Sequence, residues 1–139
     1  KVVRDKVRDY LNANWTDTVI AGEENEIDDP PVTLDPWLSY GFTGNREVPS
    51  SIGAPGARCY REDGVVYFNV WVASGTGSDV ALTYAESIRS MMRYLELGDG
   101  VKLTVANPPN TAIPSQTNSS KGNFFAYAVF VDYDYDYQI

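Results

Sequence analysis

Apolar residues recur at helical spacing near the start of the chain, with charged residues around the rest of the turn. The apolar positions are Val3, Val7, Tyr10 and Leu11. This pattern predicts an amphipathic helix that ends at residues 12–14. Residues 17–21, which end in Val19-Ile-Ala21, predict a short strand.

Apolar residues at alternate positions predict four more strands, at residues 37–43, 58–73, 101–105 and 123–133. The strand at 58–73 has the strongest signal. Val66, Phe68, Val70 and Val72 point to one face of it, and Val65, Tyr67, Asn69 and Trp71 point to the other. Because both faces are largely apolar, we expect one to pack on helices and the other to be covered by another sheet or another subunit.

A second helix is predicted after the break at 74–77, with Ser78 or Asp79 as its cap. Its core-facing stripe is Ala81, Ala85, Ile88, Met92 and Leu95. Gly98 and Gly100 are expected to end it. The order α-β-β-β-α-β-β predicts an α+β fold, with a mixed or antiparallel sheet of about five strands packed against two helices. Residues 1–139 are expected to form a single domain.

Three long segments lack apolar periodicity and predict loops, at residues 22–34, 44–57 and 107–123. Loops of such length are uncommon unless they are functional or disordered. The first is acidic between Glu23 and Asp29, which indicates a solvated loop or a surface for a basic partner. The second carries Arg46, Glu47 and Val48, which are candidate contact residues.

Charge and residue types exclude several classes of function. The chain has 139 residues and a net charge of −8, which argues against binding nucleic acid by neutralising phosphates. It has no histidine and one cysteine, Cys59, so an internal disulfide, a cysteine-based metal site and the commonest general base are all excluded. No apolar run approaches the roughly 20 residues of a membrane span, and no signal-peptide layout is present. The chain opens at Lys1 inside a helix, so residues are expected to precede it.

Two short motifs resemble catalytic or phosphate-binding patterns and are better explained as turns and loops. Gly75-Thr-Gly77-Ser78 precedes a helix, but the lysine and the third glycine of the phosphate-binding patterns are missing. Lys121 follows two serines in a loop that offers no support for a Ser–Lys pair. We therefore expect no catalytic residue, no cofactor and no metal, and the chain is not expected to be an enzyme.

Aspartate and tyrosine alternate near the end of the chain. In an extended strand, Asp132, Asp134 and Asp136 lie on one face and three phenols lie on the other. Neighbours on one face of a strand are about 6.6 Å apart, too far for tight chelation by these side chains alone. The pattern indicates either a charged sheet edge that discourages wrong pairing or an acidic wall inside an assembly.

Three segments resemble the small tail terminator proteins of long-tailed, lambda-like phages. The first is the initial helix and strand up to Glu23-Glu-Asn25, and the second is the Pro36–Thr43 strand followed by Gly44. The third and most specific is Tyr60-Arg61, the strand Gly64–Ala73, the Gly75-Thr-Gly77 turn and the helix 81–92. The long segments at 45–57 and 107–122 and the Tyr-Asp tail depart from the family pattern.

The resemblance implies a structural protein of a phage tail, or of a particle derived from one. Such a protein forms a ring, which is hexameric in characterised relatives. The ring caps the tail tube, stops its growth and meets the head–neck connector. DNA passes through the ring without specific binding. The protein is expected in the virion after assembly in the host cytoplasm, with Arg46, Glu47 and Val48 at the tube or neck interface and Asp132, Asp134 and Asp136 at an acidic lumen.

Two alternatives stay open. The chain could be another neck or tail-completion protein of the same fold. It could also be a small ligand-binding or carbohydrate-binding module, since it contains 10 Tyr and 3 Trp. Aromatic rings stacked in an exposed groove would favour the binding module, and buried rings would favour assembly.

Overall fold

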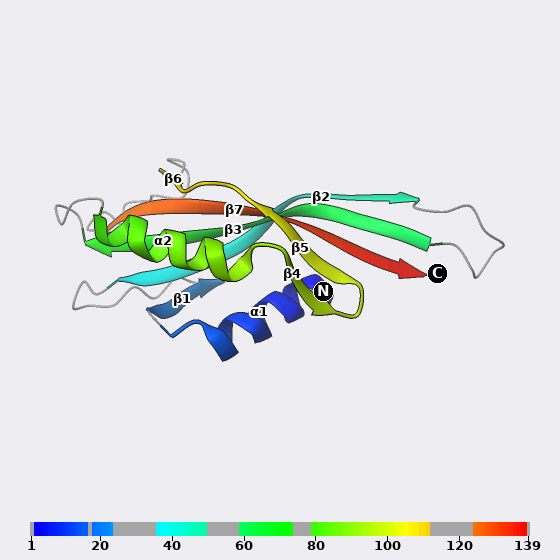
Figure 1. Cartoon of the computed structure of the whole chain (residues 1–139), viewed down its shortest axis with the longest axis horizontal. Coiled ribbons are helices and arrows are strands. Elements are labelled where there is room, and N and C mark those ends of the chain that lie inside the picture. Colours follow the sequence, from blue (N-terminus) through cyan, green and yellow to red (C-terminus); the bar gives the residue numbers. More distant parts are fainter. Residues whose placement is uncertain are drawn as a thin grey trace.

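The computed structural model describes residues 2–16, 18–23, 36–49, 59–73, 79–111 and 124–138. Two helices and seven strands follow one another along these residues (Figure 1). They are α1 Val2–Asn14, β1 Val19–Glu23, β2 Trp37–Pro49, β3 Cys59–Ala73, α2 Asp79–Met92, β4 Leu95–Gly98, β5 Val101–Ala106, β6 Asn110–Thr111 and β7 Phe124–Gln138. Neither of these two helices has the length and apolar composition that crossing a membrane requires.

The strands form a single sheet in the order β1-β2-β3-β7-β5-β4, with β6 paired to β7. β1 runs parallel to β2, and the other pairs are antiparallel. The predicted α+β class, with a mixed sheet and two helices, is confirmed. The sheet has seven strands because β4 and β6 join the five that the sequence predicted.

Both helices pack on one face of the sheet, here called the helix face. The buried stripe of α1 is Val3, Val7 and Leu11, and that of α2 is Ala81, Ala85, Ile88 and Met92. All of these except Ala81 share one core cluster with Val66, Phe68 and Val70 of β3 and with Val129, Val131 and Tyr133 of β7. The prediction that one face of β3 packs on helices is therefore confirmed, and the structure shows that this face carries the even-numbered residues.

The second helix ends earlier than predicted. α2 stops at Met92, and Tyr94 adopts a φ of 51° that leaves the helical conformation. Leu95, predicted in the helical stripe, begins β4 and packs its side chain on the same core. Gly98 and Gly100, with φ of 87° and 84°, form the turn from β4 to β5 and do not end the helix.

The opposite face of the sheet, here called the far face, is apolar and buried at one end. Trp37 of β2 and Trp71 of β3 stack with ring centroids 5.1 Å apart, and both are fully buried with Ala126. Asn69 is also buried, at 3% exposure. We expected another sheet or another subunit to cover this face of β3. At the Trp71 end this expectation is wrong, because the face is already buried within the single chain.

Three strands extend past both helices and form an arm (Figure 1). The arm consists of residues 43–49 of β2, 59–65 of β3 and 132–138 of β7, paired side by side. Residues 44–49, predicted as the start of a long loop, are strand. The pairing of β2 shifts between Thr43 and Arg46, where Gly44 has a φ of 67° that favours glycine. The rest of that segment, 50–58, lies outside the described residues.

Candidate assembly surface

A row of charged side chains crosses the far face of the sheet at the arm. Direct cross-strand pairing aligns one residue from each of five strands. In order across the sheet they are Arg46 of β2, Asp63 of β3, Asp134 of β7, Lys102 of β5 and Glu96 of β4. The signs run positive, negative, negative, positive, negative, and we call this set the charged row.

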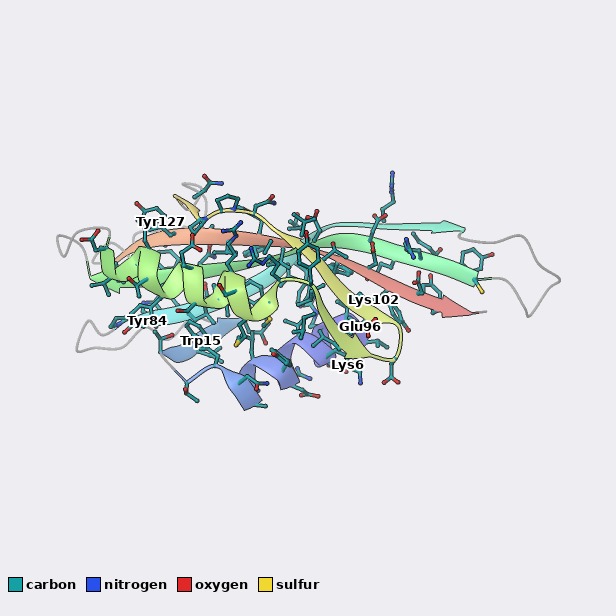
Figure 2. The ribbon with its side chains drawn as sticks, viewed as in Figure 1. Lys6, Trp15, Tyr84, Glu96, Lys102 and Tyr127 are labelled. Carbon is teal, nitrogen blue, oxygen red and sulfur yellow. The ribbon has the colours of Figure 1, made fainter. Side chains whose placement is uncertain are left out.

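The outer pairs of the charged row attract, and the central pair repels. Arg46 Nη2 lies 3.6 Å from Asp63 Oδ2, and Lys102 Nζ lies 3.6 Å from Glu96 Oε1. Figure 2 shows Lys102 and Glu96 on the neighbouring strands of the β4–β5 hairpin. Asp63 and Asp134 stand directly opposite each other, an arrangement that costs stability when both are charged. Arg46 and Lys102 flank this pair and offset part of the repulsion, and both carboxylates stay partly exposed to a partner outside the subunit.

The next pair along the arm joins Arg61 of β3 to Asp136 of β7. The guanidinium donates two hydrogen bonds, from Nε to Oδ1 at 2.7 Å and from Nη2 to Oδ2 at 3.1 Å. Hydrogen bonding to Arg61 lowers the pKa of Asp136, and Asp136 in turn raises the pKa of Arg61. The two side chains are 44% and 39% exposed, so solvent screening keeps the pair weak.

Replacing Arg61 with methionine is expected to lower the free energy of unfolding by about 0.5–1 kcal/mol at pH 7. Because the folded pKa of Asp136 is depressed, its contribution is present above the ordinary aspartate pKa and is lost as pH falls through the lowered value. The loss caused by Arg61→Met should therefore shrink as the pH falls below the ordinary aspartate range and Asp136 becomes protonated. Urea unfolding of both proteins at neutral and at acidic pH measures it. An equal difference at both would contradict this account.

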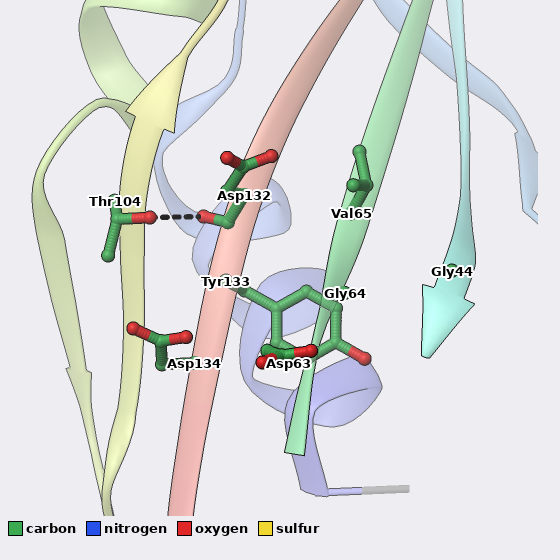
Figure 3. Close-up of a pocket in the computed structure, with 8 residues that line it drawn as sticks. All are labelled: Gly44, Asp63, Gly64, Val65, Thr104, Asp132, Tyr133 and Asp134. Carbon is green, nitrogen blue, oxygen red and sulfur yellow. Dashed lines mark hydrogen bonds between the residues drawn. The ribbon is translucent and has the colours of Figure 1, made fainter. Parts of the chain in front are cut away.

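An open hollow of about 340 Å³ lies beside the charged row on the far face (Figure 3). Three carboxylates line it, those of Asp63, Asp132 and Asp134. Thr104 of β5 closes one side and donates from its hydroxyl to the Asp132 carbonyl oxygen at 3.3 Å. Gly44 and Gly64 also line it and contribute no side chain, which leaves room for the hollow. Val65 and Tyr133 complete the lining, so the hollow is open and acidic, with a smaller apolar part.

The arrangement offers little to a metal or to catalysis. Within the described residues, no group of three or more Cys, Asp or Glu side chains is placed to hold a metal ion. The Tyr133 hydroxyl donates to Glu62 Oε2 at 2.9 Å, and burial together with this carboxylate raises the pKa of Tyr133. A buried phenol with a raised pKa stays protonated at neutral pH, so it supports the fold and does not act as a base.

The predicted lumen residues share one face of β7, as the alternation indicated. Asp132 and Asp134 meet at the hollow, whereas Asp136 is tied to Arg61. β7 lies between β3 and β5, in the interior of the sheet, so the interpretation of this segment as a charged edge is wrong. The face assignment follows from the sequence, but the position of the strand depends on pairing with residues more than 60 positions away.

The predicted tube contacts lie on the β2 side of the arm. The side chains of Arg46 and Glu47 are exposed, and that of Val48 lies outside the described set. Arg46 faces Asp63 on the far face, and Glu47 stands opposite Glu62 on the helix face. Sequence reasoning missed Asp63, Lys102 and Glu96 as site residues. Only alternation with Val65 could have placed Asp63 on the far face, and the strand that carries Glu96 was not predicted.

Among the described aromatic residues, the three tryptophans are buried, three tyrosines of the arm stack on one another, and Tyr94 is 73% exposed. Trp15, Trp37 and Trp71 are at most 5% exposed. On the helix face of the arm, Tyr137 stacks on Tyr135 with centroids 5.1 Å apart, and on Tyr60 at 6.0 Å. The stacked rings of the arm therefore cover part of one another's faces, and the tryptophans are closed to solvent. At these positions the observation favours assembly over a carbohydrate-binding surface.

Comparison with known proteins supports the fold and identifies no function. No family model matches the chain, and no curated protein matches it. A solved structure that is 20% identical matches with a TM-score of 0.56, over 95% of this chain and 94% of its own. The name of that protein states no activity, ligand or partner. At this identity the match shows a shared fold along nearly the whole chain. The class defined so far is a small α+β protein whose extended sheet carries a charged far face.

The acidic segment 24–29, the Gly75–Ser78 turn and the Ser119–Lys121 motif lie outside the described residues. Cys59, at the first position of β3, is partly buried. None of these positions enters the candidate surface.

Proposed function

We propose that this chain is a tail terminator of a long-tailed phage or of a particle derived from one. It would form a ring, hexameric as in the family it resembles, that caps the tail tube and meets the head–neck connector. The observation that carries the proposal is the arm, a three-stranded extension whose far face bears charges and no helix. Such a surface suits contact between large assembled parts better than binding of a small molecule.

The segments that resemble the family build the part of the sheet from which the arm extends. Residues 37–43 form the first half of β2, and Tyr60-Arg61 and Gly64–Ala73 lie in β3, the strand between β2 and β7. The helix 81–92 lies within α2 and covers the helix face. The charged row itself lies outside these segments, since Arg46 and Asp134 fall in parts of the chain that depart from the family pattern, so the resemblance and the candidate surface support the proposal separately.

The layering of the subunit favours an acidic channel. Both helices lie on one face, so that side of the subunit is wider, and a ring is expected to turn the far face inward. Asp132 and Asp134 would then face the channel together with Asp63. Carboxylates in that position repel DNA phosphates and allow passage without binding. In this arrangement the exposed end of β2 near Glu47 contacts the tube or neck.

Particles assembled without this protein are expected to carry overlong tails that fail to join heads. The physical reason is that an uncapped tube end keeps its polymerising surface. Electron microscopy of particles from a deletion strain measures tail length, and complementation by the intact chain is the control. Tails of normal length joined to heads would reject the terminator role. Tails of normal length without heads would favour the alternative of a neck or tail-completion protein.

A further inference from the structure

The sheet has two unpaired edges at the level of the charged row. β1 pairs with β2 only from Trp37 to Tyr40, so in the described residues no strand lies beside β2 along the arm. On the opposite side of the sheet, β4 is the outermost described strand. An unpaired strand edge is a template for pairing with another chain unless the protein uses or protects it. The two edges lie at the same height because the charged row runs from one to the other.

These edges carry opposite charges on the same face. The Arg46 side chain on the β2 edge is 71% exposed, and the Glu96 side chain on the β4 edge is 76% exposed. Within the described residues, Arg46 pairs with Asp63 and Glu96 pairs with Lys102, each at 3.6 Å, and pairs so exposed contribute little stability. Both side chains are therefore available to a partner at low cost to the fold.

Arg46 and Glu96 cannot meet within one chain. Four strand spacings separate them, which amounts to about 19 Å across the sheet. They can meet only between two copies, where the β4 edge of one lies beside the β2 edge of the next. The order of signs would then continue across the boundary, with the negative end of one charged row facing the positive end of the following row.

We propose that copies of this chain join edge to edge, with the arm of β2 in one copy along β4 of its neighbour and Arg46 facing Glu96. The inference rests on the proposed ring and identifies the surfaces that close it. It assigns Arg46 to the contact between copies and leaves Glu47 for the tube or neck.

Strand direction agrees with a closed ring. Four antiparallel steps separate β2 from β4, so the two edge strands run in the same direction. Copies related by rotation about an axis that runs along the strands keep that direction and would pair β4 to β2 as parallel strands. A two-fold dimer would instead join each edge to itself and bring like charges together. The charge pattern therefore favours head-to-tail closure over a symmetric dimer.

The β4 edge is held in place from the helix side. Lys6 of α1 forms an ion pair with Asp99 in the β4–β5 turn, with Nζ 2.8 Å from Oδ2 (Figure 2 labels Lys6). Leu95 and Leu97 pack on the core from the same hairpin. An edge fixed in advance loses less conformational freedom when it binds.

Charge reversal tests the contact. Arg46→Glu alone and Glu96→Arg alone should each abolish the ring in size-exclusion chromatography with light scattering, because like charges then meet at every boundary. Mixing the two variants in equal amounts should restore it, since alternating copies place opposite charges at every boundary. Asp9→Arg reverses an exposed carboxylate on α1 and serves as the matched control, with a ring expected. Rings of normal yield from both single variants would overturn the proposal.

Cross-linking locates the contact directly. In a Cys59→Ser background, Arg46→Cys with Glu96→Cys should give a disulfide-linked ladder of copies under mild oxidation, while each single-cysteine chain stops at dimer. A disulfide within one chain is excluded by the separation of the two positions. The absence of a ladder, from purified protein or from assembled particles, would overturn the edge contact. Tail length in particles without the protein tests the terminator role independently, so the two failures are distinguishable.

Discussion

Replacing Trp71 with alanine is expected to lower the free energy of unfolding by about 3–5 kcal/mol. Trp71 is fully buried, stacks on Trp37 at an interplanar angle of 8°, and donates from Nε1 to Ser39 Oγ at 2.9 Å. The substitution leaves a cavity on the far face and removes that hydrogen bond. Urea unfolding followed by circular dichroism measures the change. The expected loss is a large part of the 5–15 kcal/mol that holds a typical domain together.

Trp71→Phe is the matched control for this prediction. It keeps a ring against Trp37 and removes only the indole N–H and part of the volume, so we expect a smaller loss than for alanine. A loss below about 1 kcal/mol for Trp71→Ala would contradict the burial of this end of the far face within a single chain. It would favour the original expectation that another subunit covers it.

The sequence predicted the layers of this fold well and the edges of the sheet poorly. Alternation along β3 and the helical stripes depend on neighbouring residues, and the buried side chains lie where these patterns placed them. β4 was missed because Leu95 continues the helical spacing after Met92. Only the positive φ of Tyr94 separates them, and nothing in the local sequence signals it.

The end of β2 was missed for a different reason. Gly44 and Pro49 indicate turns, yet both lie in a strand because β3 offers a long pairing partner. Glycine is tolerated there at a shift in pairing, and proline is tolerated at the unpaired edge. Tertiary pairing therefore overrides the local preference, as is common in sheets.

The candidate surface could be predicted only in part. The shared face of Asp132, Asp134 and Asp136 follows from a period of two, but their charged neighbours come from strands distant in sequence. The charged row requires the register of five strands at once. A single substitution that shifts one strand by one residue would turn its charge to the opposite face. Register is thus the physical link between the fold and the proposed assembly.

Tyr133 sets that register at the base of the arm, and its replacement by alanine is expected to cost about 3–5 kcal/mol of stability. The Tyr133 side chain is 1% exposed and packs edge-on against Phe42, with the two ring centroids 6.3 Å apart. Its ring crosses Gly64, the residue directly opposite on β3, where an added Cβ would lie 2.9 Å from the hydroxyl oxygen. Such a pair fits only in one register. Urea unfolding of the variant measures the loss.

Two further variants separate packing from hydrogen bonding at this position. Tyr133→Phe keeps the ring and removes the donor to Glu62, so a loss of about 1–3 kcal/mol is expected. Gly64→Ala should destabilise the parent chain and have less effect in the Tyr133→Ala background, because the clash with the phenol is then gone. Additive effects of Gly64→Ala and Tyr133→Ala would show that the ring does not lie across Gly64. In that event the register of the arm, and with it the charged row, would lose its structural basis.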